Sequence, residues 1–239
     1  MRRKQEACEE VGIAPIHHEL AADTSEGELL GLVSDLNADE GVTGILVQLP
    51  LPDHMDEGRV IRAIAPIKDV DGFHPMSAGH LLQGEPTFVA ATPAGIMEIL
   101  RAYEIPLEGA RAVVVGRSNI VGKPISLLLL AENATVTMCH SRTRDLGGVL
   151  READVVVAAV GRAAMVTREM VKAGAAVIDV GINRVDGKVV GDGAEDVREV
   201  AGHLTPVPGG VGPMTIASLL RNTVRAAQYQ AETLAFPGG

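Results

Sequence analysis

The segment Ala112–Pro124 constrains the fold of this chain more than any other. It consists of a Val-rich stretch, a glycine turn and the start of an apolar helix, with Gly116 ending the stretch and Gly122 opening the helix. Further short apolar runs follow at residues 134–139, 154–160 and 175–180. Short Val-rich strands that alternate with helical segments are typical of a parallel sheet in an α/β domain.

The glycine turn is an altered form of the dinucleotide-binding fingerprint, because Ser118 stands where the second glycine of G-x-G-x-x-G belongs. NAD-binding domains place a carboxylate after the second strand, where it binds the ribose 2′-hydroxyl. Here His140, Ser141 and Arg142 follow that strand, and none of them is acidic. Since a guanidinium binds phosphate through a fork of donors, Arg142 and Arg117 predict NADP rather than NAD. The alternative for Arg142 is a solvated loop position.

Two later segments also suggest a ligand site at the strand tips. Val160–Arg162 and Gly181–Asn183 end the third and fourth predicted strands and place small residues where a cofactor would pass. Asp186-Gly187 then indicates a hairpin. The segment 204–215 holds three prolines and three glycines, yet it is apolar. We interpret it as a rigid lip over a ligand site, followed by a helix whose first residue is Pro213; a Pro/Gly linker is the alternative.

The amino-terminal part begins with a helical pattern over Arg2–Val11, which no capping residue precedes. Ile13–Leu20 is predicted as a strand, and Ser25 with Glu28 forms a capping box that opens the next helix. Because a domain rarely begins within a helix, we expect that an upstream segment is missing. A naturally short amino end is the alternative.

Polar residues in two apolar segments of this part are candidates for a binding site. Gln48 lies near the end of a predicted buried strand, Gly44–Leu49, where it faces a ligand or is satisfied by loop backbone. Asp69 and Asp71 flank a turn in the loop after a short helix. One carboxylate is expected to brace the turn and the other to bind a ligand through paired N–H groups. Thr92 is expected to cap the next helix.

Composition narrows the classes of function. The chain has 239 residues and a net charge of −10, which argues against a nucleic-acid surface or an anionic membrane as partner. Cys8 and Cys139 are expected to be buried thiols in a reducing, cytoplasmic compartment. No apolar run approaches the roughly 20 residues that span a bilayer. No clustered metal ligands were found, so no metal is expected.

Together the motifs resemble those of one enzyme family. GILVQLPLP at 44–52, KDVDGFHP at 68–75, TPAGIMEIL at 92–100, GRSNIVGKP at 116–124, VIDVGIN at 177–183 and TPVPGGVGPMT at 205–215 occur in the family order and cover nearly the whole chain. They are similar to the bifunctional methylenetetrahydrofolate dehydrogenase/methenyltetrahydrofolate cyclohydrolases. The resemblance implies two α/β domains: a folate-binding catalytic domain at 1–98 and 214–239, lacking its first segment, and a Rossmann-like NADP-binding domain at 99–213. It also implies that the carboxy-terminal helix packs back on the first domain, and that the enzyme is a homodimer.

The resemblance also implies roles for individual residues. Lys4 matches the catalytic lysine of a Tyr-x-x-x-Lys motif whose tyrosine would precede Met1, Gln48 orients that lysine, and Asp71 binds the pterin ring. Lys4, Gln48 and Asp71 are therefore the expected catalytic residues. The expected substrate contacts are Val47, Gln48, Leu49, Asp71, Pro208, Gly209, Gly210, Val211 and Gly212. The expected cofactor contacts are Gly116, Arg117, Ser118, Ser141, Arg142 and Ile182.

The implied activity has two steps that share one cleft between the domains. A hydride passes from 5,10-methylenetetrahydrofolate to NADP, and water then opens the methenyl product to 10-formyltetrahydrofolate with the help of Lys4. One alternative is an NADP-binding remnant without folate chemistry, which the absent tyrosine and first strand favour. A second alternative is a dehydrogenase of the shikimate type, against which the VQLPLP and PGGVGPMT segments speak.

Overall fold

The computed structural model describes residues 2–237, and its contacts divide the chain into two compact units. The first unit comprises Met1–Val89 and Ser218–Gly239, and the second comprises Ala90–Ala217. The helix α8 (Val211–Gln230) begins in the second unit and ends in the first. The division falls ahead of α5 (Ala91–Ala102), whereas the domain boundary expected at residues 98 and 99 lies inside this helix.

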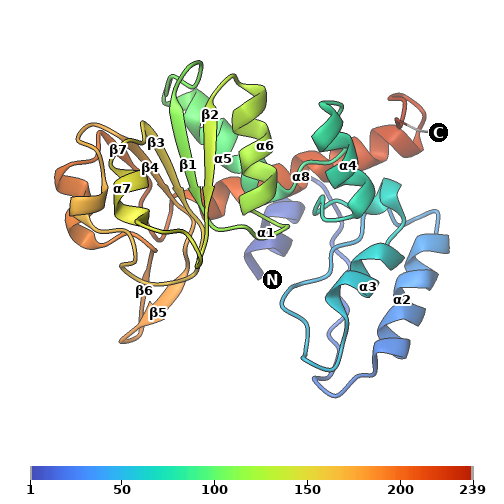
Figure 1. Cartoon of the computed structure of the whole chain (residues 1–239). Coiled ribbons are helices and arrows are strands. Elements are labelled where there is room, and N and C mark those ends of the chain that lie inside the picture. Colours follow the sequence, from blue (N-terminus) through green and yellow to red (C-terminus); the bar gives the residue numbers. More distant parts are fainter. Residues whose placement is uncertain (1, 238–239) are drawn as a thin grey trace. The chain divides into compact units, whose positions relative to one another are not determined.

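The second unit is built on a parallel sheet with the strand order β2-β1-β3-β4-β7 (Figure 1). Its strands are β1 (Arg111–Val115), β2 (Thr135–Cys139), β3 (Val155–Ala158), β4 (Ala176–Asp179) and β7 (His203–Leu204). All neighbouring strands are parallel, which confirms the predicted β-α-β series. The chain passes from β1 to β2 on one side and then to β3 on the other. The strand order therefore reverses beside β1, and ligands bind at such a reversal in open α/β sheets.

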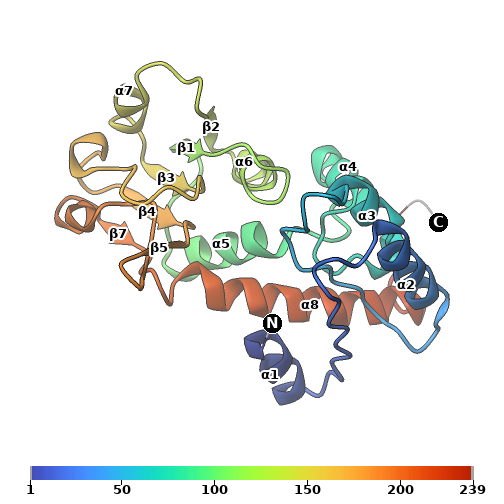
Figure 2. The same ribbon diagram turned by 90° about the horizontal axis from the view of Figure 1, so that it is seen from below.

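Both faces of the strands β1, β3 and β4 are buried, which explains their nearly continuous apolar runs. Val114 and Val157 pack on one face with α5 and α6 (Gly122–Ala131). Val113 and Val156 pack on the other face with α7 (Leu146–Leu150) and a 3₁₀ turn at Glu195–Glu199. Figure 2 shows α5 and α6 on the same side of the sheet and α7 on the opposite side.

The carboxyl ends of the strands carry shorter elements. A 3₁₀ turn at Arg168–Met170 precedes β4, and β5 (Asn183–Val185) and β6 (Lys188–Val190) follow it as an antiparallel hairpin. Asp186 and Gly187 have φ values of 48° and 76° at the tip of this hairpin. Two successive positive φ values are typical of a type I′ turn, so the hairpin prediction is confirmed.

The first unit contains helices around a small apolar core. Its helices are α1 (Arg2–Glu10), α2 (Glu26–Ala38), α3 (Glu57–Ala63), a 3₁₀ turn at Pro66–Lys68, α4 (Pro75–Gln83) and the end of α8. The core residues are Leu29, Val33, Val42, Ile45, Val60 and Ile64. From α8, Asn222 donates hydrogen bonds to the carbonyls of Val70 and Val89, both at 2.9 Å. The carboxy-terminal part of the helix therefore packs on this unit, as expected.

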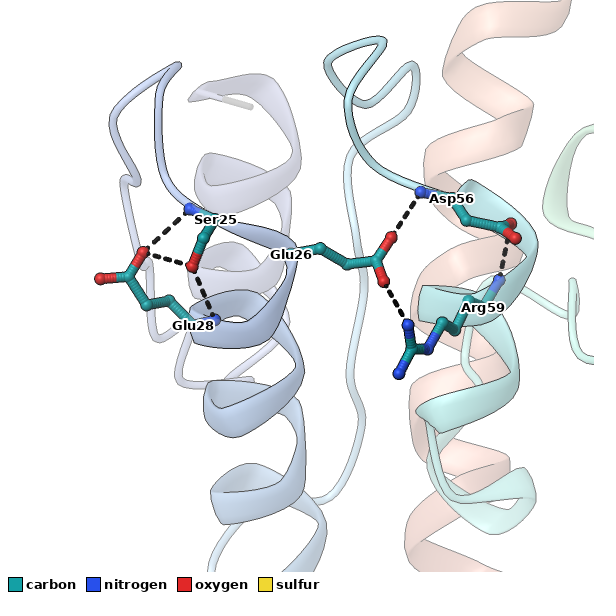
Figure 3. A network of polar contacts seen from close by, with 5 residues as sticks. All are labelled: Ser25, Glu26, Glu28, Asp56 and Arg59. Atoms are coloured by element: carbon teal, nitrogen blue, oxygen red, sulfur yellow. Dashed lines mark hydrogen bonds and ion pairs between the residues drawn. The ribbon is translucent and has the colours of Figure 1, made fainter.

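Side chains at the start of α2 join this helix to α3 (Figure 3). Ser25 and Glu28 form the predicted capping box, in which Ser25 N and Oγ each donate to Glu28 Oε2 at 2.8 Å. Glu26 accepts from Asp56 N at 2.7 Å and pairs with Arg59 at 2.9 Å. Asp56 in turn caps α3 by accepting from Arg59 N at 3.0 Å.

Several local predictions for the first unit were wrong. Residues 13–20 form no strand, and within 44–49 the ladder is reduced to a single bridge between Ile45 and Asp69. The reason is that a strand needs a neighbour, and within residues 2–237 these extended segments have no ladder to join. α1 buries none of its residues, and Cys8 is half-buried rather than buried.

The predicted starts of two helices in the second unit also need correction. α5 begins at Ala91 behind Ala90, so Thr92 is not its cap. Instead, Thr92 Oγ1 lies 3.1 Å from Thr215 Oγ1 in the first turns of α8. α8 begins at Val211, which makes Pro213 its third residue. Gly95 of α5 packs so closely on Met214 that a Cβ there would lie 2.8 Å from the Met214 carbonyl carbon. The two helices therefore meet through small residues and hydroxyls.

None of the described helices is long and apolar enough to cross a membrane. Within the same residues, no group of three or more His, Cys, Asp or Glu side chains could hold a metal ion.

We expect Ser25→Ala to lower the free energy of unfolding by about 1 kcal/mol, because Glu28 N at the start of α2 loses the hydroxyl that accepts its hydrogen bond. The control is Ser34→Ala on the exposed face of the same helix, which should be neutral or slightly stabilising, since alanine is the better helix former. Urea denaturation of both variants measures the difference. Equal losses in the two variants would contradict the role of the capping box.

Candidate active site

The loop Pro66–Pro75 contains a buried lysine, Lys68, that ties the loop to the end of α2. Lys68 Nζ donates to the carbonyls of Leu36, Asn37 and Asp39 at 3.0, 2.9 and 2.7 Å. These carbonyls lie at the end of α2, where the helix leaves acceptors unsatisfied and favours a cation. Lys68 is therefore a structural anchor of the loop. In the sequence, Lys68 stands out only as a lysine beside the two aspartates of this loop.

Asp69 is the aspartate that braces the turn, the role that was predicted for one of the two aspartates of this loop. Asp69 accepts hydrogen bonds from Phe73 N at 3.2 Å, His74 N at 2.8 Å and Ser77 Oγ at 3.1 Å. Its carboxylate thus braces the turn at Gly72, which has a φ of 73°. Burial raises the pKa of Asp69, and these three hydrogen bonds lower it.

Asp71, the second aspartate of this loop, is also buried. Its exposed fraction is 8%, and its carboxylate takes part in no hydrogen bond within the described residues. Loss of solvent raises the pKa of Asp71 to about 7, the charge of Lys4 lowers it, and the charge of Asp69 raises it. A buried carboxylate without donors is costly unless a ligand supplies them. A perturbed pKa at such a position is typical of functional sites.

Lys4 and Gln48 come together in the same unit, although 44 residues separate them. Lys4 Nζ lies 3.5 Å from Gln48 Oε1, and Gln48 Nε2 donates to the carbonyl of Leu49 at 2.9 Å. The amide of Gln48 is thus fixed with its oxygen toward the lysine. The amine of Lys4, which contacts the Gln48 amide, also lowers the pKa of Asp71 through its charge.

The first unit also contains a cavity of about 870 Å³, which Gln48 helps to line. Mostly apolar side chains of 13–22, α2, 41–52 and α8 line it, including Val47 and Gln48. Lys4, Leu49 and Asp71 are not among its lining residues.

The second unit has a cavity of about 300 Å³ at the reversal of strand order beside β1. Loops that follow β1, β2 and β3 line it, and the complete lining is Val115, Gly116, Arg117, Ser118, His140, Ser141, Ala159, Val160, Arg162 and Met165. The structure therefore brings together four predicted cofactor residues: Gly116, Arg117, Ser118 and Ser141. Two arginines and no carboxylate in the lining favour a phosphate-bearing ligand.

The glycine loop of this cavity shows why its residues are small. A Cβ on Gly116 would collide with the carbonyl of Ala159, and one on Gly122 would collide with the carbonyl of Gly116. Ser118 Oγ accepts from Val121 N at 3.1 Å and Gly122 N at 3.3 Å, just ahead of α6. The hydroxyl thus occupies donors at the helix start, a position that attracts anions.

Other predicted residues lie elsewhere in the second unit. Arg142 and Ile182 are outside the lining of the cavity, and Ile182 is 72% exposed. Arg142 N donates to His140 Nδ1 at 3.1 Å, so its backbone braces the loop. Pro208, Gly209 and Gly212 are exposed and Gly210 is half-buried. The side chain of Val211 packs in the core beside α5, which leaves only its backbone for a ligand.

The cavity also includes residues that were not named as cofactor contacts. These are Val115, His140, Ala159, Val160, Arg162 and Met165. Val160 and Arg162 belong to a strand tip that the sequence indicated, but their side chains could not be placed without the strand order.

Comparison with known proteins supports an assignment for both units. Residues 90–231 match the NAD(P)-binding domain of the tetrahydrofolate dehydrogenase/cyclohydrolases, and residues 1–71 match their catalytic domain. The bifunctional protein FolD of Magnetococcus marinus is 59% identical over 230 residues, which is 95% of this chain and 81% of that protein.

Solved structures agree with this match. The FolD methylenetetrahydrofolate dehydrogenase/cyclohydrolase of Campylobacter jejuni has a TM-score of 0.93 at 48% identity, over 98% of this chain and 83% of that one. The enzyme of Trypanosoma brucei, solved with NADP cofactor and an inhibitor, has a TM-score of 0.91 at 39% identity, over 98% and 82% of the two chains. The shikimate-type alternative is thereby set aside: this chain belongs to the tetrahydrofolate dehydrogenase/cyclohydrolase family.

Proposed function

We propose that this chain oxidises 5,10-methylenetetrahydrofolate to 5,10-methenyltetrahydrofolate with NADP and hydrolyses the product to 10-formyltetrahydrofolate. The first unit binds the folate and the second binds the cofactor. The observation that carries the proposal is the buried Asp71 carboxylate, which lacks hydrogen-bond donors within the described residues. A 2-amino-pyrimidinone edge offers the two parallel N–H donors that such a carboxylate can accept.

Lys4 and Gln48 act on the reacting carbon in this proposal. NADP supplies a hydride acceptor, and the methylene carbon loses a hydride to become the methenyl cation. Water then attacks the methenyl carbon while the Lys4 amine takes one proton from the water. The bond from this carbon to N5 breaks as the remaining hydroxyl becomes the formyl C=O on N10. N5 keeps the bonding electron pair and takes up one proton, and the other proton is released to solvent. Gln48 Oε1 holds the Lys4 amine in place. A positioned general base contributes typically 10²- to 10⁴-fold to such a step.

The residues of the second unit fit NADP by their chemistry. Arg117, Ser118, His140 and Ser141 offer cationic and hydroxyl groups around one cavity, where a carboxylate for a free ribose 2′-hydroxyl is lacking. We propose Gly116, Arg117, Ser118 and Ser141 as cofactor contacts. Arg142 and Ile182 are proposed only as peripheral contacts.

Two further properties belong to the proposal. The segment Pro208–Gly212 contacts ligand mainly through its backbone, since three of its members are glycines. The enzyme is a cytoplasmic homodimer, as the family resemblance implies.

Lys4→Ala should lower the hydrolysis of methenyltetrahydrofolate by about 100-fold or more, because the base is lost, while NADP affinity stays unchanged. The matched control is Arg3→Ala, which removes an exposed cation from the position of α1 just before Lys4. Loss of the methenyl absorbance measures hydrolysis, and calorimetric titration measures NADP binding. A wild-type chain that binds NADP but does neither reaction would favour the remnant alternative. Full hydrolysis by Lys4→Ala would remove the lysine from the mechanism.

Asp71→Asn should weaken folate binding and stabilise the free protein. The amide accepts only one of the two N–H bonds, so the folate KM should rise by about 10-fold or more. The wild-type pKa of about 7 lies above the ordinary value, so the folded chain holds its proton longer than the unfolded chain does. Wild-type stability therefore falls, relative to Asp71→Asn, as the pH rises from about 4 to about 7.

Chemical denaturation at pH 4 and pH 7.5 checks the stability difference for Asp71→Asn. Asp69→Asn is the matched control, since its amide would face bound N–H donors and should destabilise the chain at both pH values. An Asp71→Asn protein that is less stable than wild type at pH 7.5, or an unchanged folate KM, would contradict the proposal.

Arg117→Ala should reduce the preference for NADP over NAD by about 10-fold or more, because a charge-assisted contact to the 2′-phosphate is lost. Arg142→Ala should reduce it less, since Arg142 does not line the cavity. The ratio of kcat/KM values with the two cofactors measures the preference. A larger effect at Arg142 would instead assign the contact with the 2′-phosphate to Arg142, in the loop after β2.

A further inference from the structure

Asp192 is a fully buried carboxylate in the second unit, just after β6. Its Oδ2 accepts hydrogen bonds from Val160 N at 2.7 Å and Gly161 N at 3.0 Å. Its Oδ1 accepts from Arg162 N at 2.7 Å and Asn183 Nδ2 at 3.0 Å. Three consecutive amides of the loop after β3 thus point at one side chain, some 30 residues away in the sequence.

Asp192 is itself held in place by β4. Its backbone N–H and that of Gly193 donate to the two oxygens of Asp179, both at 2.8 Å. A Cβ on Gly181 would collide with the Asp192 carboxylate, and a Cβ on Gly191 would collide with that of Asp179. The fit leaves no room for a shift of Asp192, so the loop after β3 is tied to the end of the neighbouring strand.

The loop that Asp192 holds forms one wall of the cofactor cavity. Val160 and Arg162 line this cavity together with Arg117. The Arg162 side chain has no ion pair within the described residues, and no carboxylate lines the cavity. A guanidinium in this setting suits a phosphate oxygen.

We propose that Asp192 is a positioning residue of the cofactor site, which fixes the loop after β3 so that Arg162 binds a phosphate of NADP. The inference rests on the proposed function, because it requires that NADP occupies this cavity. A carboxylate suits this place because all four of its neighbours are donors. An asparagine of the same shape would point its NH₂ group at two of them and leave them unpaired.

A double-mutant cycle on NADP affinity tests this inference. Calorimetric titration gives the Kd of NADP for wild type, Arg162→Ala, Asp192→Asn and the double variant. We expect each single change to raise the Kd by about 10-fold. The double variant should be no worse than the weaker-binding single variant, because Asp192 acts through Arg162.

The matched control is Asp154→Asn, which alters a carboxylate just before the first residue of β3. Asp154 accepts from Arg111 N at 2.9 Å and Lys172 Nζ at 2.6 Å, and it does not line the cavity. This change should lower the free energy of unfolding and leave the Kd of NADP unchanged. If Asp192→Asn loses affinity for NADP and Asp154→Asn does not, the loss reflects positioning of the loop rather than a general loss of stability.

The outcomes are distinct. Unchanged affinity in Asp192→Asn, or losses in the two single variants that add in the double variant, would overturn the inference while the proposed function stands. Wild-type protein that does not bind NADP would overturn both. If Asp192→Asn does not fold, Gly161→Ala replaces it, because the added Cβ has no neighbour within 4 Å but strains a φ of 65° in the same loop. Gly161→Ala must then raise the Kd of NADP in the presence of Arg162 and have no further effect in the Arg162→Ala background. Unchanged affinity in Gly161→Ala would overturn the inference.

Discussion

A carboxylate that leaves water must find hydrogen-bond donors, and this requirement organises the loops of both units. Asp69, Asp179 and Asp192 each accept at least three hydrogen bonds, most of them from backbone N–H groups. The backbone donors belong to loop segments, so each carboxylate accepts hydrogen bonds that a strand or helix would otherwise accept. These hydrogen bonds fix the loops that follow β3 and β4. They also fix the turn that follows the 3₁₀ segment Pro66–Lys68.

Asp71 lies only two residues after Asp69, yet its buried carboxylate has no hydrogen-bond donor within the described residues. Burial raises its pKa to about 7, whereas Asp69 has its three donors in the loop itself. A group in this condition lowers the stability of the free protein, and donors from a ligand would recover that free energy. Under the proposed function, the same burial that destabilises the free chain would strengthen its binding to a substrate with paired N–H groups. Stability and affinity are opposed at this one side chain.

The second unit was predictable because its information is local. Val-rich runs, the glycines at 116 and 122 and the Asp186-Gly187 turn each act within a few residues, and parallel strands need no more than this to be recognised. The first unit was less predictable for the opposite reason. Residues 13–20 and 44–49 have the composition of strands, but a strand exists only where another strand pairs with it. The helix α2, whose capping box is local, was predicted correctly.

The candidate site shows the same limit. Sequence alone could name Asp69 and Asp71 but could not assign their roles from the residues, because the roles depend on which loop amides reach each carboxylate. Asp192 gave no signal, since an Asp-Gly pair after a hairpin is ordinary, and its three amide partners lie some 30 residues earlier. Its only trace is indirect: Gly181 and Gly191 are small because the two buried carboxylates occupy the space of their side chains. In the proposed site, Lys4, Gln48, Asp71 and the glycine loop were visible in the sequence, whereas Asp192 and Arg162 could be recognised only once the strand order was known.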